Sequence, residues 1–199
     1  KEKHFYGGHG IVGAQVSLGT GLGFANKYRE NGNVAMAFFG DGASNQSQVY
    51  ESFNMAELWK LPVVYVIENN KYGMGTSVAR ASATTDLSQR GASFGIPGEQ
   101  VDGMDVRAVK AASEKALAWC REGKGPYILE MITYRYRGHS MSDPAKYRSK
   151  DEVQKMRTEH DPIEQVRQRL LDKGWASEDD LKAIDKEVRA ACAEAAEFA

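Results

Sequence analysis

The amino-acid sequence predicts an α/β fold, in which a mostly parallel sheet carries helices on both faces and a helical C-terminal extension follows. Two apolar runs, 34–39 and 62–67, have the length of buried strands, and one helical pattern separates them. A strand, a crossover helix and a second strand form a parallel unit. The residues after 150 show helical periodicity instead. We therefore expect one α/β domain over residues 1–150 and a helical extension of the same domain over 151–199.

The composition excludes several classes of function without indicating a ligand. The chain has 199 residues, 26 basic and 27 acidic side chains, and a formal net charge of -1. No basic excess therefore points to nucleic acid or to an anionic membrane. No apolar run approaches the roughly 20 residues that a bilayer span needs. Cys120 and Cys192 form neither a disulfide framework nor a zinc motif, so we expect a soluble protein of a reducing compartment.

The start of the chain is rich in glycine. Seven of the 20 glycines lie between Gly7 and Gly23, a density typical of backbone that lies close to a ligand or to another backbone. We expect a loop here that leads into a helix over about 14–28 with a face of small residues, and then a turn at 31–33. Because this loop opens the sequence without a preceding strand, we expect the domain to be N-terminally incomplete.

The first two predicted strands both end in polar residues. Residues 34–39 are continuously apolar, which predicts a strand buried on both faces, and Gly40-Asp41-Gly42 follows it. A helix is predicted over 47–58, and the strand over 62–67 is followed by Glu68-Asn69-Asn70. Parallel strands joined by one helix have their carboxyl ends at the same edge of the sheet. That edge is where open α/β sheets bind ligands.

The remaining elements are predicted from composition and capping residues. Residues 71–100, rich in Gly, Ser, Thr and Ala, indicate a long loop that is either ordered and functional or mobile. Asp105 is placed to cap a helix, and a third strand is predicted over 127–133. An arginine-rich loop covers 134–149. The tail is predicted to be helical, with Asp161 at the start of one helix.

Asp41 and Asn70 are the best candidates for holding a metal ion. A carboxylate between two glycines at a strand end can turn outward, and the bare backbone lets a bulky anion approach. Asp-Gly also occurs in ordinary turns, but Asn70 closes the neighbouring strand and brings an amide oxygen to the same edge. The backbone carbonyl of Tyr72 can add a third oxygen. Such oxygen donors suit Mg²⁺, and a helix beginning near Ala43 would favour a bound phosphate.

Three stretches resemble a known enzyme family. The motif GDG followed about two dozen residues later by NN resembles the magnesium-diphosphate signature of thiamine-diphosphate enzymes. Residues 38–76, FFGDGASNQSQVYESFNMAELWKLPVVYVIENNKYGMGT, are similar to the 2-oxo acid dehydrogenase E1 α subunits. Residues 5–21, FYGGHGIVGAQVSLGTG, are similar to that family's cofactor-approach loop. Residues 134–149, YRYRGHSMSDPAKYRS, resemble the loop of pyruvate dehydrogenase E1 α members.

The resemblance implies a thiamine-diphosphate-binding fold and assigns roles to residues at the strand ends. It implies Asp41, Asn70 and the carbonyl of Tyr72 as ligands of Mg²⁺. The backbone of Gly42 and Ala43 would contact the diphosphate of the cofactor. Both cofactors, thiamine diphosphate and Mg²⁺, are thus implied by the family.

Further residues receive roles from the two flanking loops. Gly10 and Val12 would contact the aminopyrimidine ring, and His139 would act as a catalytic residue on the diphosphate or the reacting intermediate. Without the motif, a histidine in an arginine-rich loop would be a solvated or anion-pairing side chain. Ser140 matches a position that is phosphorylated in mitochondrial members.

Three arginines in the 134–149 loop are candidates for binding phosphate or an acidic partner surface, with ordinary solvation as the alternative: Arg135, Arg137 and Arg148.

The implied function is that of the α subunit of pyruvate dehydrogenase E1. It decarboxylates pyruvate and passes the acetyl group to the lipoyl groups of E2. The family works as an α2β2 heterotetramer in which the β subunit supplies the general base for the cofactor. The expected partners are therefore the β subunit, the lipoyl domain of E2 and pyruvate. The compartment would be the cytoplasm in a bacterium, which we favour, or the mitochondrial matrix in a eukaryote.

Two alternatives to this function are open at this point. The substrate of the E1 α subunit could be a branched-chain 2-oxo acid or acetoin instead of pyruvate. From another class, the chain could be a non-catalytic interaction domain that inherited the fold. Retention of Asp41, Asn70 and His139 argues against the second alternative.

Overall fold

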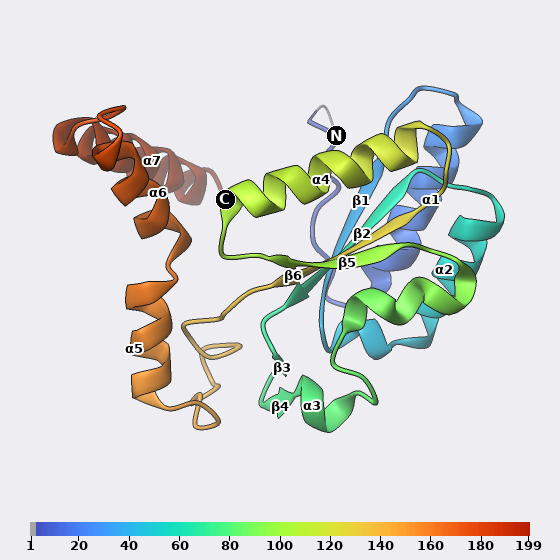
Figure 1. The fold of residues 1–199 in the computed structure, drawn as a ribbon, viewed down its shortest axis with the longest axis horizontal. Coiled ribbons are helices and arrows are strands. Elements are labelled where there is room, and N and C mark those ends of the chain that lie inside the picture. Colours follow the sequence, from blue (N-terminus) through green and yellow to red (C-terminus); the bar gives the residue numbers. More distant parts are fainter. Residues whose placement is uncertain (1–2) are drawn as a thin grey trace. The chain divides into compact units, whose positions relative to one another are not determined.

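The computed structural model describes residues 3–199, which divide into two compact units after Lys150. The first unit contains all the strands together with helices α1 to α4 and the short helices η1 and η2 (Figure 1). The second unit is helical and follows from Asp151 to the end of the chain.

The first unit is built on a four-stranded parallel sheet with the order β1-β2-β6-β5. Its strands pair in parallel throughout, and β1 and β2 are in register from Ala35 opposite Val63 to Gly40 opposite Glu68. The predicted α/β class with a parallel sheet is thereby confirmed. The strands, in spatial order, are β1 (Ala35–Gly40), β2 (Val63–Asn69), β6 (Tyr127–Ile132) and β5 (Gly98–Asp102).

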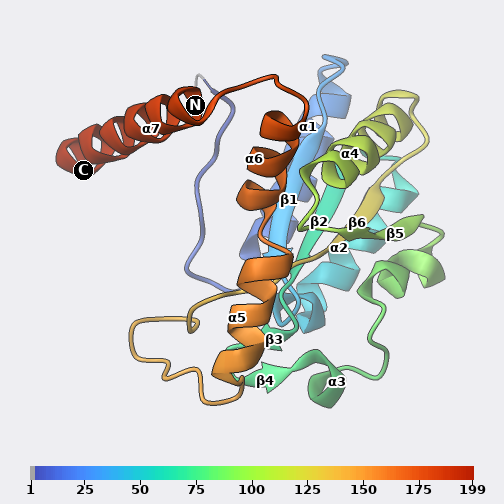
Figure 2. The same ribbon diagram turned by 60° about the vertical axis from the view of Figure 1, so that its left-hand side comes forward.

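Helices cover both faces of this sheet, as predicted (Figures 1 and 2). Helices α1 (Ala14–Tyr28) and α2 (Ser47–Leu58) contribute Val16 and Phe53 to a core that includes alternate residues of β1 and β2. On the other face, α4 (Val106–Arg121) buries its apolar side against β2, β5 and β6. The side chain of Asp105 caps α4 by accepting a hydrogen bond from the amide of Arg107.

The expectation that the strand over 34–39 is buried on both faces is wrong. Ala35, Ala37 and Phe39 are buried, but Met36 is 39% exposed and Phe38 is 50% exposed. The reason is the position of β1 at the edge of the sheet, because α4 packs mainly on the other three strands. The apolar run therefore predicts the strand correctly, but it does not predict whether other elements bury its second face.

Residues 71–100 hold more regular structure than a loop. They contain a short antiparallel pair of strands, β3 (Tyr72–Gly73) and β4 (Thr76–Ser77), and then α3 (Val78–Ala81) and η2 (Leu87–Phe94). Strand β5 overlaps the end of this stretch and was not predicted, because GEQVD lacks a continuous apolar run.

The α-helix after Asp41 starts later than the predicted position near Ala43. Ala43–Asn45 form a short 3-10 helix, η1, and α2 begins only at Ser47. Gln46 separates the two because its backbone is extended, with φ -71° and ψ 138°.

The second unit contains α6 (Pro162–Asp172), α7 (Glu178–Phe198) and most of α5 (Lys150–Glu159). The side chain of Asp161 caps α6 as predicted, and Ser177 and Asp180 form a capping box at the start of α7. Within residues 3–199, no helix is both long enough and apolar enough to span a membrane.

Candidate active site

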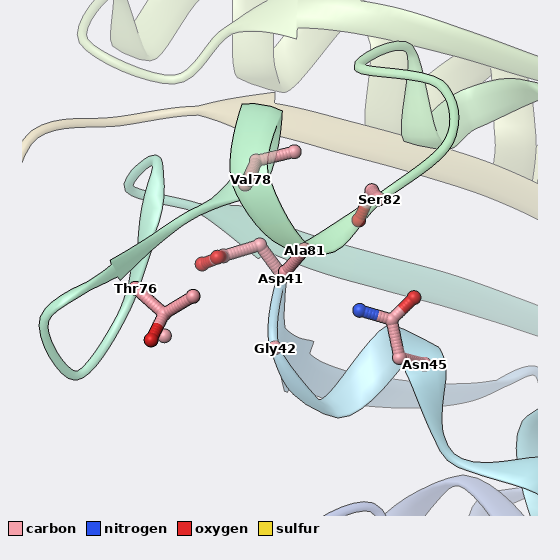
Figure 3. Close-up of a pocket in the computed structure, with 8 residues that line it drawn as sticks. Asp41, Gly42, Asn45, Thr76, Val78, Ala81 and Ser82 are labelled. Carbon is pink, nitrogen blue, oxygen red and sulfur yellow. The ribbon is translucent and has the colours of Figure 1, made fainter.

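A small cavity of about 150 Å³ lies at the carboxyl edge of the sheet. One wall is the turn that follows β1, and the other is formed by the segment from β3 to the end of α3 (Figure 3). The lining side chains are small or polar, which leaves the backbone accessible: Asp41, Gly42, Asn45, Gly73, Thr76, Val78, Ala81 and Ser82.

Among residues 3–199, Asp41 is the only charged residue that lines this cavity, and it is only 4% exposed. Its carboxylate extends toward the segment that carries Thr76 and Val78 (Figure 3). Burial raises the pKa of Asp41 above its ordinary value, although its own backbone amide, the charge of Arg135 and the amide of Asn70 act in the opposite direction. A desolvated carboxylate of this kind is stabilised by a bound cation.

The turns after β1 and β2 touch each other beside Asp41. A Cβ atom on Gly42 would lie 3.3 Å from the Cα atom of Gly73, so glycine permits this close approach. The backbone amide of Asn70 lies close enough to the carboxylate of Asp41 to lower its pKa. The side-chain oxygen of Asn70 accepts a long hydrogen bond of 3.4 Å from the amide of Tyr72. The structure therefore brings Asp41, Asn70 and Tyr72 to one place.

The oxygen atoms in this region fit a hard divalent cation. Within the described part of the chain, no three His, Cys, Asp or Glu side chains form a metal-binding cluster. One carboxylate, one amide oxygen and one backbone carbonyl are nevertheless a suitable protein contribution for Mg²⁺, which completes its coordination with phosphate and water oxygens. The buried carboxylate of Asp41 and the bare backbone at Gly42 thus fit both a metal ion and a diphosphate.

Arg90 lies behind the cavity and was missed by the sequence reasoning. Its guanidinium group donates to the side-chain oxygen of Asn45 at 2.8 Å and to the hydroxyl of Ser82 at 3.1 Å. It also donates to the backbone carbonyl of Ser44 at 3.3 Å and to the hydroxyl of Tyr50. Arg90 therefore connects the two walls and places a positive charge next to the cavity.

A second missed group is Glu130, a buried carboxylate in the middle of β6. It is 0% exposed and accepts hydrogen bonds from Asn69, Ser88 and Gln100. Its charge acts on Asp41 and raises the pKa of that residue. The sequence does indicate this group, because a glutamate inside the apolar strand YILEMI would be buried. Burial of a carboxylate is unfavourable unless hydrogen-bond donors surround it.

His139 lies in an exposed loop whose backbone is fixed by Asp143. The Asp143 carboxylate accepts hydrogen bonds from the amide of His139 at 2.7 Å, from the hydroxyl of Tyr147 at 2.7 Å and from the amide of Ala145 at 2.9 Å. These donors, the His139 amide first, lower the pKa of Asp143 to about 2. The imidazole Nδ1 of His139 lies 3.3 Å from a guanidinium nitrogen of Arg135.

Arg148 is nearly buried and bound within the loop, so the expectation of an ordinary solvated side chain is wrong for it. It is 9% exposed, donates to the backbone carbonyls of Arg135 and Arg137, and stacks over the rings of Tyr134 and Tyr147 at 5.1 and 5.2 Å. The two carbonyls lie 13 and 11 residues before Arg148. No sequence pattern predicts hydrogen bonds at this spacing. Arg148 is a structural clamp of the loop.

The other predicted residues lie outside the lining of the cavity. Gly10 and Val12 are exposed, and the carbonyl of Val12 accepts a hydrogen bond from Gln48 at the start of α2. Ala43 is buried within η1. Ser140 is exposed, with its hydroxyl 3.0 Å from that of Ser142.

Comparison with known proteins gives consistent matches over the whole chain. The profile of the family described as "Dehydrogenase E1 component" matches residues 1–199. A protein of Rhizobium meliloti (strain 1021) named "Pyruvate dehydrogenase E1 component subunit alpha" is 79% identical over 199 residues, which are 100% of this chain and 57% of that protein.

More distant relatives carry the same name. The Zymomonas mobilis protein is 58% identical over 198 residues, covering 100% of this chain and 56% of the relative. A protein of Dictyostelium discoideum, whose name adds "mitochondrial", is 58% identical over 188 residues, covering 94% of this chain and 49% of the relative. The chain thus spans about half the length of these relatives.

Proposed function

The chain belongs to the dehydrogenase E1 component family, and on this premise we propose that it forms the metal-diphosphate half of the active site in the α subunit of a pyruvate dehydrogenase E1 enzyme. The family implies thiamine diphosphate as cofactor. The names of the relatives point to pyruvate as the substrate and to an assembly with other subunits. The observation that carries this proposal is the meeting of the Asp41 carboxylate with the Asn70 turn at the edge of a cavity.

Each residue at this edge has a defined task in the proposed site. Asp41, the side-chain oxygen of Asn70 and the carbonyl of Tyr72 would hold Mg²⁺, whose charge offsets that of the diphosphate. The backbone of Gly42, which is exposed, and that of Ala43 at the start of η1 would contact the diphosphate. Arg90 adds positive charge behind the same cavity through its contacts with Asn45 and Ser82.

Thiamine diphosphate, when bound, supplies the electron sink that decarboxylation of a 2-oxo acid requires. The contribution of this chain is to bind the cofactor's diphosphate end and to place His139 in a loop of defined conformation. Asp143 fixes the backbone of His139, and Arg135 lies beside its imidazole. We assign His139 to contact with the diphosphate or the reacting intermediate, and Gly10 and Val12 to contact with the aminopyrimidine ring.

The proposed partners complete what these residues do not provide. A general base for the aminopyrimidine is assigned to a β subunit in an α2β2 heterotetramer, and the acetyl group passes to the lipoyl domain of E2. We place the protein in the bacterial cytoplasm, since a bacterial relative is 79% identical.

The test uses the full-length α subunit co-expressed with its β subunit. Binding of thiamine diphosphate at fixed Mg²⁺ is measured by calorimetry, and turnover is compared for pyruvate, a branched-chain 2-oxo acid and acetoin. The substitution Asp41→Ala should abolish tight cofactor binding, whereas Asp179→Ala on the exposed surface of α7 should not. Unchanged affinity in D41A would refute the metal assignment, and faster turnover of a larger substrate would refute pyruvate.

A further inference from the structure

Glu130 is a buried charge that the proposed site does not use directly. It lies in β6 between Leu129 and Met131, and its side chain has no exposure to solvent. The lining of the cavity does not include it. A carboxylate in such a position is tolerated only when hydrogen-bond donors surround it. Its partners therefore indicate what it does.

The three donors to Glu130 come from three different segments. Its Oε1 atom accepts a hydrogen bond of 2.6 Å from Nδ2 of Asn69 at the end of β2. Its Oε2 atom accepts from the amide of Ser88 in η2 at 2.9 Å and from Nε2 of Gln100 in β5 at 3.0 Å. Both carboxylate oxygens are thus used, and the end of β2 is tied to its neighbours through one side chain.

The contact with Asn69 also fixes the turn that follows it. With Nδ2 bound to Glu130, the Oδ1 atom of Asn69 faces the chain and accepts a hydrogen bond of 2.8 Å from the amide of Lys71. Lys71 has a φ of 72°, a left-handed conformation that is strained for a lysine. The side-chain contact of Asn69 stabilises that conformation, as in other Asx turns. The next residue in the chain is Tyr72.

We propose that Glu130 is a positioning residue, which holds the turn 69–72 through Asn69 in the conformation that directs Asn70 and the Tyr72 carbonyl toward Asp41. This inference rests on the proposed function for the identity of the ligand. It does not depend on that function for the turn itself, because the hydrogen bonds belong to this chain alone. Groups behind the ligands of a metal site commonly tune affinity in this way.

Substitution by glutamine tests the direction of these hydrogen bonds. In E130Q, the introduced side chain can keep an oxygen toward Ser88 and Gln100, but its NH₂ group then faces the NH₂ group of Asn69. If Asn69 turns to accept from it, the amide of Lys71 loses its acceptor. Adding N69D restores the pattern, because the introduced aspartate accepts both from the introduced glutamine and from Lys71. The double variant also has the same net charge as the natural chain.

The measurements use the full-length α subunit in complex with its β subunit. Thiamine diphosphate is titrated at fixed Mg²⁺, and hydrogen exchange of peptides covering 69–73 is followed by mass spectrometry without cofactor. We expect E130Q to weaken cofactor binding by about tenfold or more and to speed exchange in 69–73. We expect N69D/E130Q to recover both. The control is E99Q, which removes a charge from β5 outside this network and should change neither.

The outcomes separate this inference from the proposed function. Unchanged exchange and affinity in E130Q, or a double variant that recovers neither, would overturn the positioning role. If E130Q does not fold, a double variant that folds and binds like the natural enzyme supports the role, and one that fails as well overturns it. If the natural enzyme binds no thiamine diphosphate, the proposed function fails, while the exchange of 69–73 still decides whether Glu130 holds the turn.

Discussion

The aromatic rings of Tyr72 and Tyr147 pack against each other with their centroids 4.8 Å apart. Tyr72 follows β2 and is a predicted source of a metal ligand, whereas Tyr147 belongs to the loop that carries His139. Arg135 strengthens the link, because its guanidinium donates to the carbonyl of Met74 at 3.0 Å and to the hydroxyl of Tyr147 at 2.9 Å. These contacts therefore connect the segment after β2 to the His139 loop.

Removal of the Tyr147 ring should loosen the His139 loop. An aromatic pair contributes about 1 kcal/mol beyond its buried area, and Tyr147→Ala also loses the hydroxyl contacts, so it should increase local opening by at least about fivefold. Tyr147→Phe keeps the ring and loses only the hydroxyl contacts with Arg135 and Asp143, and should have an intermediate effect. The rate of tryptic cleavage after Arg137 measures the opening. Tyr28→Ala, on the exposed side of α1, is the control, and equal rates in all variants would contradict the link.

The hydrogen bonds to Asp143 predict how the loop responds to acid. The donors lower its pKa from the ordinary 3.8 to about 2. Since the pKa is depressed in the fold, the stabilising effect of these bonds is complete above about pH 4 and is lost as the pH falls toward 2. The carboxyl carbon of Asp143, followed by NMR, should titrate near pH 2. Tyr147→Phe removes one donor and should raise the midpoint, and an ordinary midpoint in the natural protein would refute the bonds.

Much of the fold could be predicted from local sequence patterns. The buried run at 62–67, the cap at Asp105 and the third strand at 127–133 all correspond to elements of the structure. The exposed face of β1 could not be predicted, because the cover of a strand depends on the sheet order and on where α4 packs. Strand β5 could not be predicted for a similar reason, since it is held by pairing with β6 and has little apolar sequence of its own.

The candidate site was predictable only where the chemistry lies at strand ends. Asp41 and Asn70 follow neighbouring parallel strands, so their meeting required only the βαβ rule. Arg90 and Glu130 each have a partner more than 40 residues away in sequence, Ser44 and Ser88 respectively, and no spacing rule connects them. Arg148 shows the same difficulty, because a basic residue that binds loop carbonyls looks like a solvated one in the sequence.

The charge of Asp41 should lower the stability of the ligand-free protein. Burial raises its pKa, which means that the ionised carboxylate is less stable in the fold than in the unfolded chain. Asp41→Asn removes the charge at nearly constant shape, so the ligand-free variant should unfold at an equal or higher temperature at pH 7. It should lose the added stability that Mg²⁺ and thiamine diphosphate give the natural enzyme, about 2.7 kcal/mol at a hundredfold excess over Kd.

Scanning calorimetry of the full-length complex, with and without Mg²⁺ and thiamine diphosphate, measures both effects. A ligand-free D41N protein that unfolds well below the natural one would show that the carboxylate has a structural role. If Mg²⁺ and thiamine diphosphate raise the unfolding temperature of D41N as much as that of the natural protein, the metal lies elsewhere.

The packing of α1 on β1 predicts opposite effects for two glycines of one helix. A Cβ atom at Gly19 would lie 2.7 Å from the Cβ atom of Ala37, whereas nothing lies within 4 Å of one at Gly21. Gly19→Ala should therefore lower the free energy of unfolding by about 1–3 kcal/mol through overpacking. Gly21→Ala should raise it by about 0.5–1 kcal/mol, because alanine favours the helix. Urea unfolding measures both, and a stabilised G19A would show that α1 lies farther from β1 than in this structure.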